Sequence, residues 1–142
     1  MLRALFKHLL PVLALSGLMS FGALRAEAQT GPAVEAVITG QIAAFQDDDF
    51  EAAFDFASPS IRMIFQTPQR FGEMVQQGYP MVHRPDSVRF LERRERRGFV
   101  LQRVMIGDAA GRLHLLEYQM LQTDSGFLIN GVRLLPPAGT GV

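Results

Sequence analysis

The sequence predicts an α+β fold, in which N-terminal helices pack on a four-stranded antiparallel sheet formed by the C-terminal half of the chain. From Ser87 to Leu135, apolar residues alternate with polar ones, as at Val104 and Ile106. This period of two is typical of strands with one buried face. Clusters of Asp, Ser and Gly interrupt the alternation and predict the turns between strands. Upstream of Ser87, apolar residues recur at helical spacing, so helices are the expected cover for one face of the sheet.

The first 28 residues have the layout of a secretory signal peptide. A positively charged start precedes an apolar run from Leu9 to Leu24, and a small-x-small cleavage site ends at Ala28. A retained membrane anchor is the alternative, but the run is shorter than the roughly 20 apolar residues that span a bilayer. We therefore expect cleavage after Ala28, location in the periplasm or outside the cell, and membrane contact only through the transient signal peptide. Residues 29–136 then form a single domain, followed by a flexible tail at 137–142.

The composition argues against several classes of protein. The chain has no Cys, so a disulfide framework and a thiol nucleophile are excluded. Its 14 basic and 14 acidic residues balance, whereas nucleic-acid-binding domains are usually strongly basic. Beyond the signal peptide the only histidines are His83 and His114, far apart in the sequence. They cannot supply the three protein ligands of a catalytic zinc, so we predict no metal and no cofactor.

The helical half begins after a Gln-Thr-Gly-Pro joint at residues 29–32. Val34, Ile38 and Phe45 recur at helical spacing and predict a helix that ends near Gln46. The joint itself is rich in residues that interrupt helices, so we expect the helix to begin after it.

Three adjacent carboxylates follow at Asp47-Asp48-Asp49. Their spacing is wrong for a calcium loop, in which ligands alternate with spacer residues. We interpret Asp48 as the N-cap of the next helix, with Glu51 completing a capping box. That short helix carries Phe50 and Phe54 on one face.

Two further helices have the same start signal, a hydroxyl residue before a proline. Ser58-Pro59 and Thr67-Pro68 each place a cap residue before a proline at the first helical position. Gly78 marks the end of the second of these helices. Between Pro80 and Pro85 we expect a stiff, extended connection into the first strand.

The order of these elements resembles that of the nuclear transport factor 2-like (cystatin-like) superfamily, in which a curved sheet wraps around helices to form a cone with an internal pocket. Local motifs are similar to those of the bacterial domain of unknown function 4864 family: Ala43 to Phe54, Ala57-Ser58-Pro59, Gly78-Tyr79-Pro80, Arg84-Pro85 and Val88-Arg89-Phe90. The resemblance implies a secreted or periplasmic bacterial protein. It implies no activity, because the superfamily contains both enzymes and binding modules.

Five side chains are the candidate ligand-binding residues of such a domain: Tyr79, His83, Arg84, Arg89 and Tyr118. For His83 and Arg84 the alternative role is to hydrogen-bond the proline-rich loop to the sheet. For Tyr118 the alternative, which we favour, is a core residue with a paired hydroxyl group. Arg89 is expected to point away from Val88 and Phe90, and we favour an exterior position for it.

Two functions remain open from the sequence. The first is a non-catalytic module that binds a small apolar ligand or a protein partner, in the pocket or on the sheet face; the eleven Phe and seven Met of the chain favour it. The second, suggested by enzymes of the superfamily, is an isomerase- or dehydratase-like enzyme in which His83, Tyr79 and a carboxylate perform acid–base chemistry. Asp55, Asp86 and Glu117 are the candidate carboxylates. A homodimer formed through the sheet is a third possibility.

A polar segment at Glu92–Gly98 contains four arginines and is expected to form the first hairpin turn. Such a run can bind an acidic partner or anionic lipid headgroups. Because glutamates alternate with the arginines and turns are solvated, we favour a solvated hairpin without a binding role.

Overall fold

The computed structural model describes residues 19–136, with side chains from residue 28 onward. The first part of the predicted signal peptide and the predicted tail at 137–142 lie outside the described residues. The described helices are α1 (Met19–Gln46), α2 (Phe50–Asp55), α3 (Pro59–Phe65), α4 (Pro68–Gly78) and α5 (Pro80–His83). The strands are β1 (Ser87–Arg96), β2 (Phe99–Gly107), β3 (Leu113–Thr123) and β4 (Gly126–Leu135). Among the described helices, none has the length and apolarity that a membrane crossing requires.

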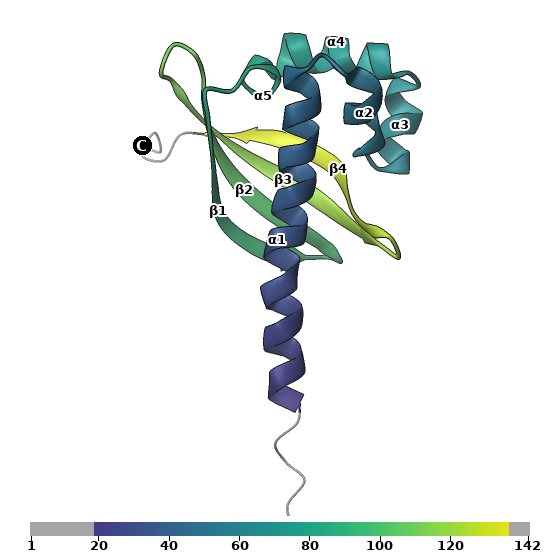
Figure 1. Ribbon diagram of the computed structural model, residues 1–142, viewed down its shortest axis with the longest axis vertical. Helices are drawn as coiled ribbons and strands as arrows, with labels where there is room; N and C mark the ends of the chain where they lie inside the picture. Colours follow the sequence, from purple (N-terminus) through teal and green to yellow (C-terminus); the bar gives the residue numbers. More distant parts are fainter. Residues whose placement is uncertain (1–18, 137–142) are drawn as a thin grey trace, which may run out of the picture.

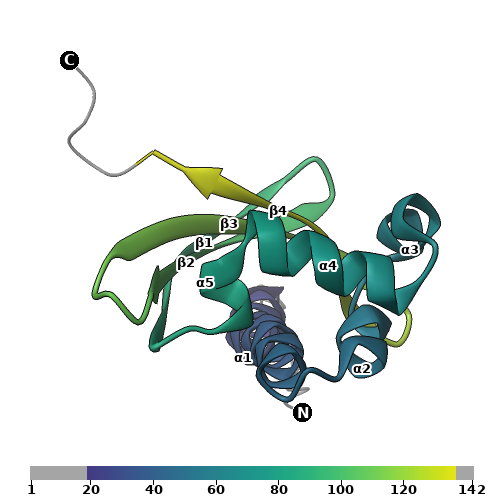
Figure 2. The ribbon, with the colours of Figure 1, turned by 90° about the horizontal axis from the view of Figure 1, so that it is seen from above.

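The four strands form one open antiparallel sheet in the order β1-β2-β3-β4. All the described helices lie on one face of it, with α1 running across the strands (Figure 1) and α4 and α5 beside it (Figure 2). We call this the core face, and the opposite, uncovered face the outer face. The predicted α+β fold class, with N-terminal helices packed on a four-stranded antiparallel sheet, is therefore confirmed.

The core lies between the helices and the core face. Tyr118 and Met120 of β3 are fully buried there. Phe71 of α4 packs between two other buried rings, with centroids 5.7 Å from Phe45 and 5.4 Å from Phe54. Aromatic pairs at these separations add to the stability that their buried area provides. The period-two alternation thus places the inward strand residues against the phenylalanines of the helices, as predicted.

The predicted caps of α3 and α4 are confirmed, whereas the predicted cap of α2 is wrong. The hydroxyl groups of Ser58 and Thr67 accept hydrogen bonds from the backbone of their own helices. The N-cap of α2 is Asp49, whose carboxylate accepts from the Ala52 N–H at 3.1 Å. Asp48 precedes the cap in a left-handed conformation (φ 53°), and its side chain bonds elsewhere.

Replacing Asp49 with alanine is expected to lower the free energy of unfolding by about 1 kcal/mol, because it removes the N-cap hydrogen bond of α2. Urea-induced unfolding measures the effect. The matched control is Asp47→Ala, which removes an exposed carboxylate that caps no helix and is expected to change stability by less than about 0.5 kcal/mol. Equal losses in the two variants would contradict the assignment of Asp49 as the cap.

Three predicted boundaries are corrected by the structure. Helix α1 does not begin after the joint at residues 29–32 but runs through Pro32, because the preceding Ala-Leu-Arg-Ala-Glu-Ala run has high helix propensity. The connection before β1 is not wholly extended: α5 forms one helical turn with Pro80 at its first position, where a missing N–H is harmless. Finally, most of the segment Glu92–Gly98 belongs to β1.

The β1–β2 turn is short because two residues with positive φ make it. Arg97 has φ 53° and Gly98 φ 81°, which is the backbone signature of a two-residue hairpin turn. Strand β1 contains a register shift between Phe90 and Arg93. The Gln102 amide of β2 donates to the Leu91 carbonyl at 3.0 Å there and so satisfies backbone that the irregular pairing leaves open.

Candidate functional site

An apolar pocket of about 200 Å³ lies between the core face and the helices. Helices α1, α3, α4 and α5 supply one wall, and β3 and β4 supply the other. Its lining includes the rings of Phe45, Phe65, Phe71, Tyr79 and Tyr118. A pocket with many apolar groups and few polar ones is the usual form of a small-molecule site.

The Tyr118 hydroxyl is the unusual polar group of this pocket. Tyr118 is 0 % exposed, and its oxygen has no hydrogen-bond partner among the described residues. Burial, with a smaller contribution from neighbouring Tyr79, raises the pKa of Tyr118 above its usual value of 10.0. The phenol therefore stays protonated at neutral pH, and its O–H is a donor that no acceptor of the described residues uses.

Tyr79 lies beside Tyr118 but has a different role. Its hydroxyl donates to the backbone carbonyl of Val132 in β4 at 3.0 Å. The hydrogen bond ties the segment between α4 and α5 to the edge of the sheet, so the Tyr79 ring forms a fixed part of the pocket wall. Of the five candidate residues, only Tyr79 and Tyr118 line this pocket.

His83 and Arg84 meet at a corner of the domain and not in the pocket. The His83 ring lies 2.7 Å from one Asp48 oxygen, and Arg84 donates to the other at 2.9 Å. Arg84 also donates to the Phe45 carbonyl at the end of α1 at 2.9 Å. The hydrogen bond from His83, followed by that from Arg84, lowers the pKa of Asp48. The pair thus joins the end of α5 to the α1–α2 turn, rather than to the sheet.

Arg89 is exposed on β1 and pairs with Met105 across the outer face. This is the exterior position that its alternation with Val88 and Phe90 predicts. None of the candidate carboxylates lines the pocket: Asp55 and Asp86 are exposed, and Glu117 is buried on the outer face.

Glu117 is the centre of a charged cluster that the sequence did not reveal. Its carboxylate contacts Arg103 at 3.2 Å, Arg133 at 2.7 Å and Arg94 at 3.6 Å. Burial alone would raise the pKa of Glu117, but hydrogen bonds from Arg133 and Arg103 outweigh it and lower the pKa. Glu117 is therefore ionised at neutral pH.

Gln41 is a second residue that the sequence analysis missed. It lines the pocket from α1, is 3 % exposed, and its side-chain amide donates to the Ala53 carbonyl at 3.1 Å. Gln41 lies on the same helix face as Ile38, Ile42 and Phe45, and a polar residue at such a position could have been identified from the sequence as buried. A polar residue in a buried helical stripe needs a partner.

Asp108 and His114 form a polar contact at the β2–β3 turn. The imidazole of His114 lies 2.8 Å from the Asp108 carboxylate, which also accepts from the backbone N–H groups of Arg112 and Ala110. The hydrogen bond from His114, then that from the Arg112 N–H, lowers the pKa of Asp108 from its usual 3.8 to about 2.

This shift predicts a pH-dependent contribution to stability. Because the folded pKa lies below the unfolded one, the contribution is present above about pH 4 and is lost as pH falls towards 2. Urea unfolding between pH 2 and pH 5 should therefore show a shallower loss of stability in Asp108→Asn than in the parent. An identical pH dependence in the two proteins would contradict this role.

Within residues 28–136, no group of three or more His, Asp or Glu side chains is arranged to hold a metal ion. Asp48 and Asp49 of the acidic triplet are instead used by the helix-corner contact and the α2 cap.

The fold and the pocket together define a small α+β domain with an apolar cavity between a single sheet and its covering helices. The chain belongs to the family described as domain of unknown function (DUF4864), which it matches over residues 27–142. No curated protein and no solved structure is found to match it.

Proposed function

We propose that this protein is a non-catalytic binding module whose internal pocket takes a small apolar molecule carrying one hydrogen-bond acceptor. The observation that carries the proposal is the buried, unpartnered hydroxyl of Tyr118 at a mostly apolar cavity. Leaving a buried hydroxyl unpaired costs free energy. A ligand that accepts a hydrogen bond from Tyr118 removes this cost.

The size of the cavity limits the ligand. An apolar cavity of about 150 Å³ in another protein is known to take up benzene, and this one is about 200 Å³. A substituted benzene with a carbonyl group, such as acetophenone, therefore has a suitable volume and chemistry.

The arrangement of the polar groups favours binding over the alternative, an acid–base enzyme using His83, Tyr79 and a carboxylate. His83 is held by Asp48 outside the pocket, and the Tyr79 hydroxyl is engaged with a backbone carbonyl. No carboxylate and no imidazole is among the described residues that line the pocket. General acid–base catalysis needs such groups within hydrogen-bond reach of the substrate.

Titration of the protein with acetophenone, followed by the backbone amide signals in NMR spectra, tests the pocket. We expect shifts at residues of its wall, such as Val75 and Ile129. Shifts confined to residues of the outer face, or no shifts at all, would contradict the proposal.

Export through a signal peptide is part of the same proposal. Cleavage after Ala28 leaves Pro32 within the first four residues, where a helix has no internal partner for its N–H groups. The family match also begins at residue 27. Mass spectrometry of the protein from the cell envelope should find a chain that begins at Gln29; a chain that retains the first 28 residues would contradict cleavage.

Membership of the nuclear transport factor 2-like superfamily is also proposed. Helices packed on one face of a single antiparallel sheet, with a pocket between them, support it.

A further inference from the structure

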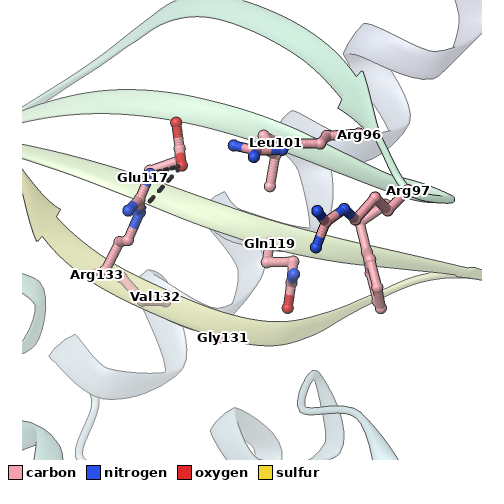
Figure 3. A pocket seen from close by; sticks show the side chains of 9 residues that line it. Arg96, Arg97, Leu101, Glu117, Gln119, Gly131, Val132 and Arg133 are labelled. Carbon is pink, nitrogen blue, oxygen red and sulfur yellow. Dashed lines mark hydrogen bonds and ion pairs between the residues drawn. The ribbon is translucent and has the colours of Figure 1, made fainter.

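A second hollow, of about 530 Å³, lies on the outer face of the sheet. We call it the arginine groove. The residues that line it include Arg96, Arg97, Phe99, Leu101, Glu117 and Arg133. Figure 3 shows Arg96 and Arg97 reaching over the sheet from its hairpin end, while Arg133 and Glu117 face one another. The groove and the internal pocket lie on opposite faces of the sheet, because the helices that wall the pocket cover the core face. The two share only Gly131 and Val132 of β4 among their lining residues.

The charges of the groove do not balance. Glu117 is shared by three arginines, one of which, Arg103, also pairs with Glu92 at 2.9 Å. In the described part of the chain, Arg96 and Arg97 have no carboxylate partner, and both are exposed. The chain as a whole has no net charge, so this positive excess is a local property of the outer face. Such a surface attracts anions.

The floor of the groove is apolar. Leu101 is 8 % exposed although it lies on the face that none of the described helices covers, and the half-buried ring of Phe99 lies on the same strand. A bare inorganic anion would leave this floor unused, and a neutral apolar molecule would leave the two guanidinium groups unpaired. The guanidinium fork matches the geometry of carboxylate and phosphate oxygens.

We propose that the arginine groove binds a small amphiphilic organic anion. Its oxyanion head pairs with Arg96 and Arg97, and its apolar body covers Phe99 and Leu101. Glu117 holds Arg103 and Arg133 in place beside it, which limits the rearrangement that binding requires. This inference is independent of the function proposed for the internal pocket.

Octanoate is a suitable probe, with acetate as the head group alone and 1-octanol as the neutral chain. NMR titration of the protein should show octanoate shifting the amides of Phe99 and Leu101, with much weaker effects from acetate and from 1-octanol. Arg96→Gln with Arg97→Gln should weaken octanoate binding by about tenfold or more, because charge-assisted hydrogen bonds are lost. Arg70→Gln with Arg89→Gln removes the same charge from positions outside the groove and should leave the affinity close to that of the parent.

Several outcomes would overturn the proposal. Octanoate shifts confined to Phe45, Val75 and other residues of the internal pocket would reject the groove while leaving the internal pocket supported. Equal binding of octanoate and 1-octanol would reject anion recognition. Binding to anionic vesicles without binding of octanoate would assign the face to a membrane surface, and self-association that protects these residues would assign it to a second copy of the chain.

Discussion

Replacing Phe54 with alanine is expected to lower the free energy of unfolding by about 3–5 kcal/mol, which is the usual range for deleting a buried aromatic ring. Phe54 is 8 % exposed, and its ring centroid lies 5.4 Å from that of Phe71. The ring joins α2 to α4 and so links the helices that cover the core face. Chemical denaturation of parent and variant measures the difference.

The matched control is Met63→Ala in α3. Met63 is also a large apolar residue of a short helix, but its side chain is 75 % exposed. Its removal is expected to change stability by less than about 0.5 kcal/mol. A loss below about 1 kcal/mol for Phe54→Ala would place that ring outside the core and contradict the packing of the helices on the sheet.

Replacing Tyr118 with phenylalanine is expected to raise the stability of the ligand-free protein by about 1–3 kcal/mol, the cost of an unsatisfied buried hydroxyl. The ring and its packing are kept, and only the unpartnered oxygen is removed. This outcome is unusual, because most substitutions of fully buried residues destabilise a protein. Thermal and urea unfolding of ligand-free protein measure it.

Tyr79→Phe is the control for this prediction. Its hydroxyl donates to the Val132 carbonyl, so its removal is expected to destabilise the protein by about 0.5–1.5 kcal/mol. Changes of the same sign in the two variants would contradict the distinction between a paired and an unpaired phenol.

Much of the fold could be predicted because its signals are local. Alternation identifies the inward residues of β2 and β3, and the Ser-Pro and Thr-Pro pairs identify the starts of α3 and α4. The pocket tyrosines, Tyr79 and Tyr118, were also among the candidate residues. Tyr118 occupies an inward position of β3 that the alternation identifies. Tyr79 lies outside the strands, between α4 and α5, and was a candidate because of its hydroxyl group alone.

The charged cluster could not be predicted because it depends on strand register. Glu117 faces Arg103 on one side and Arg133 on the other. Register shifts between Phe90 and Arg93 and between Gln119 and Met120 decide which residues of neighbouring strands meet. An irregularity of one residue changes every pairing beyond it. The second shift lies opposite Asn130 and Gly131 of β4, but an Asn-Gly pair inside a strand does not by itself say how the pairing shifts.

Contacts between distant segments were missed for a related reason. The carboxylate of Asp48 bonds His83 and Arg84, which lie 35 and 36 residues further along the chain. From the neighbouring sequence alone, Asp48 is a suitable N-cap for the helix that follows it. Nothing near it in the sequence indicates that the fold places the side chains of His83 and Arg84 beside this turn. The adjacent Asp49 takes the cap instead.

The affinity of the internal pocket for two ligands of similar size, acetophenone and ethylbenzene, tests the central claim most directly. In the parent protein acetophenone should bind about two- to tenfold more tightly, because its carbonyl accepts a hydrogen bond from the Tyr118 hydroxyl. In Tyr118→Phe this preference should disappear while ethylbenzene binding is kept. An equal preference for acetophenone in both proteins, or no binding of either ligand, would contradict the claim that this hydroxyl awaits an acceptor in an open apolar pocket.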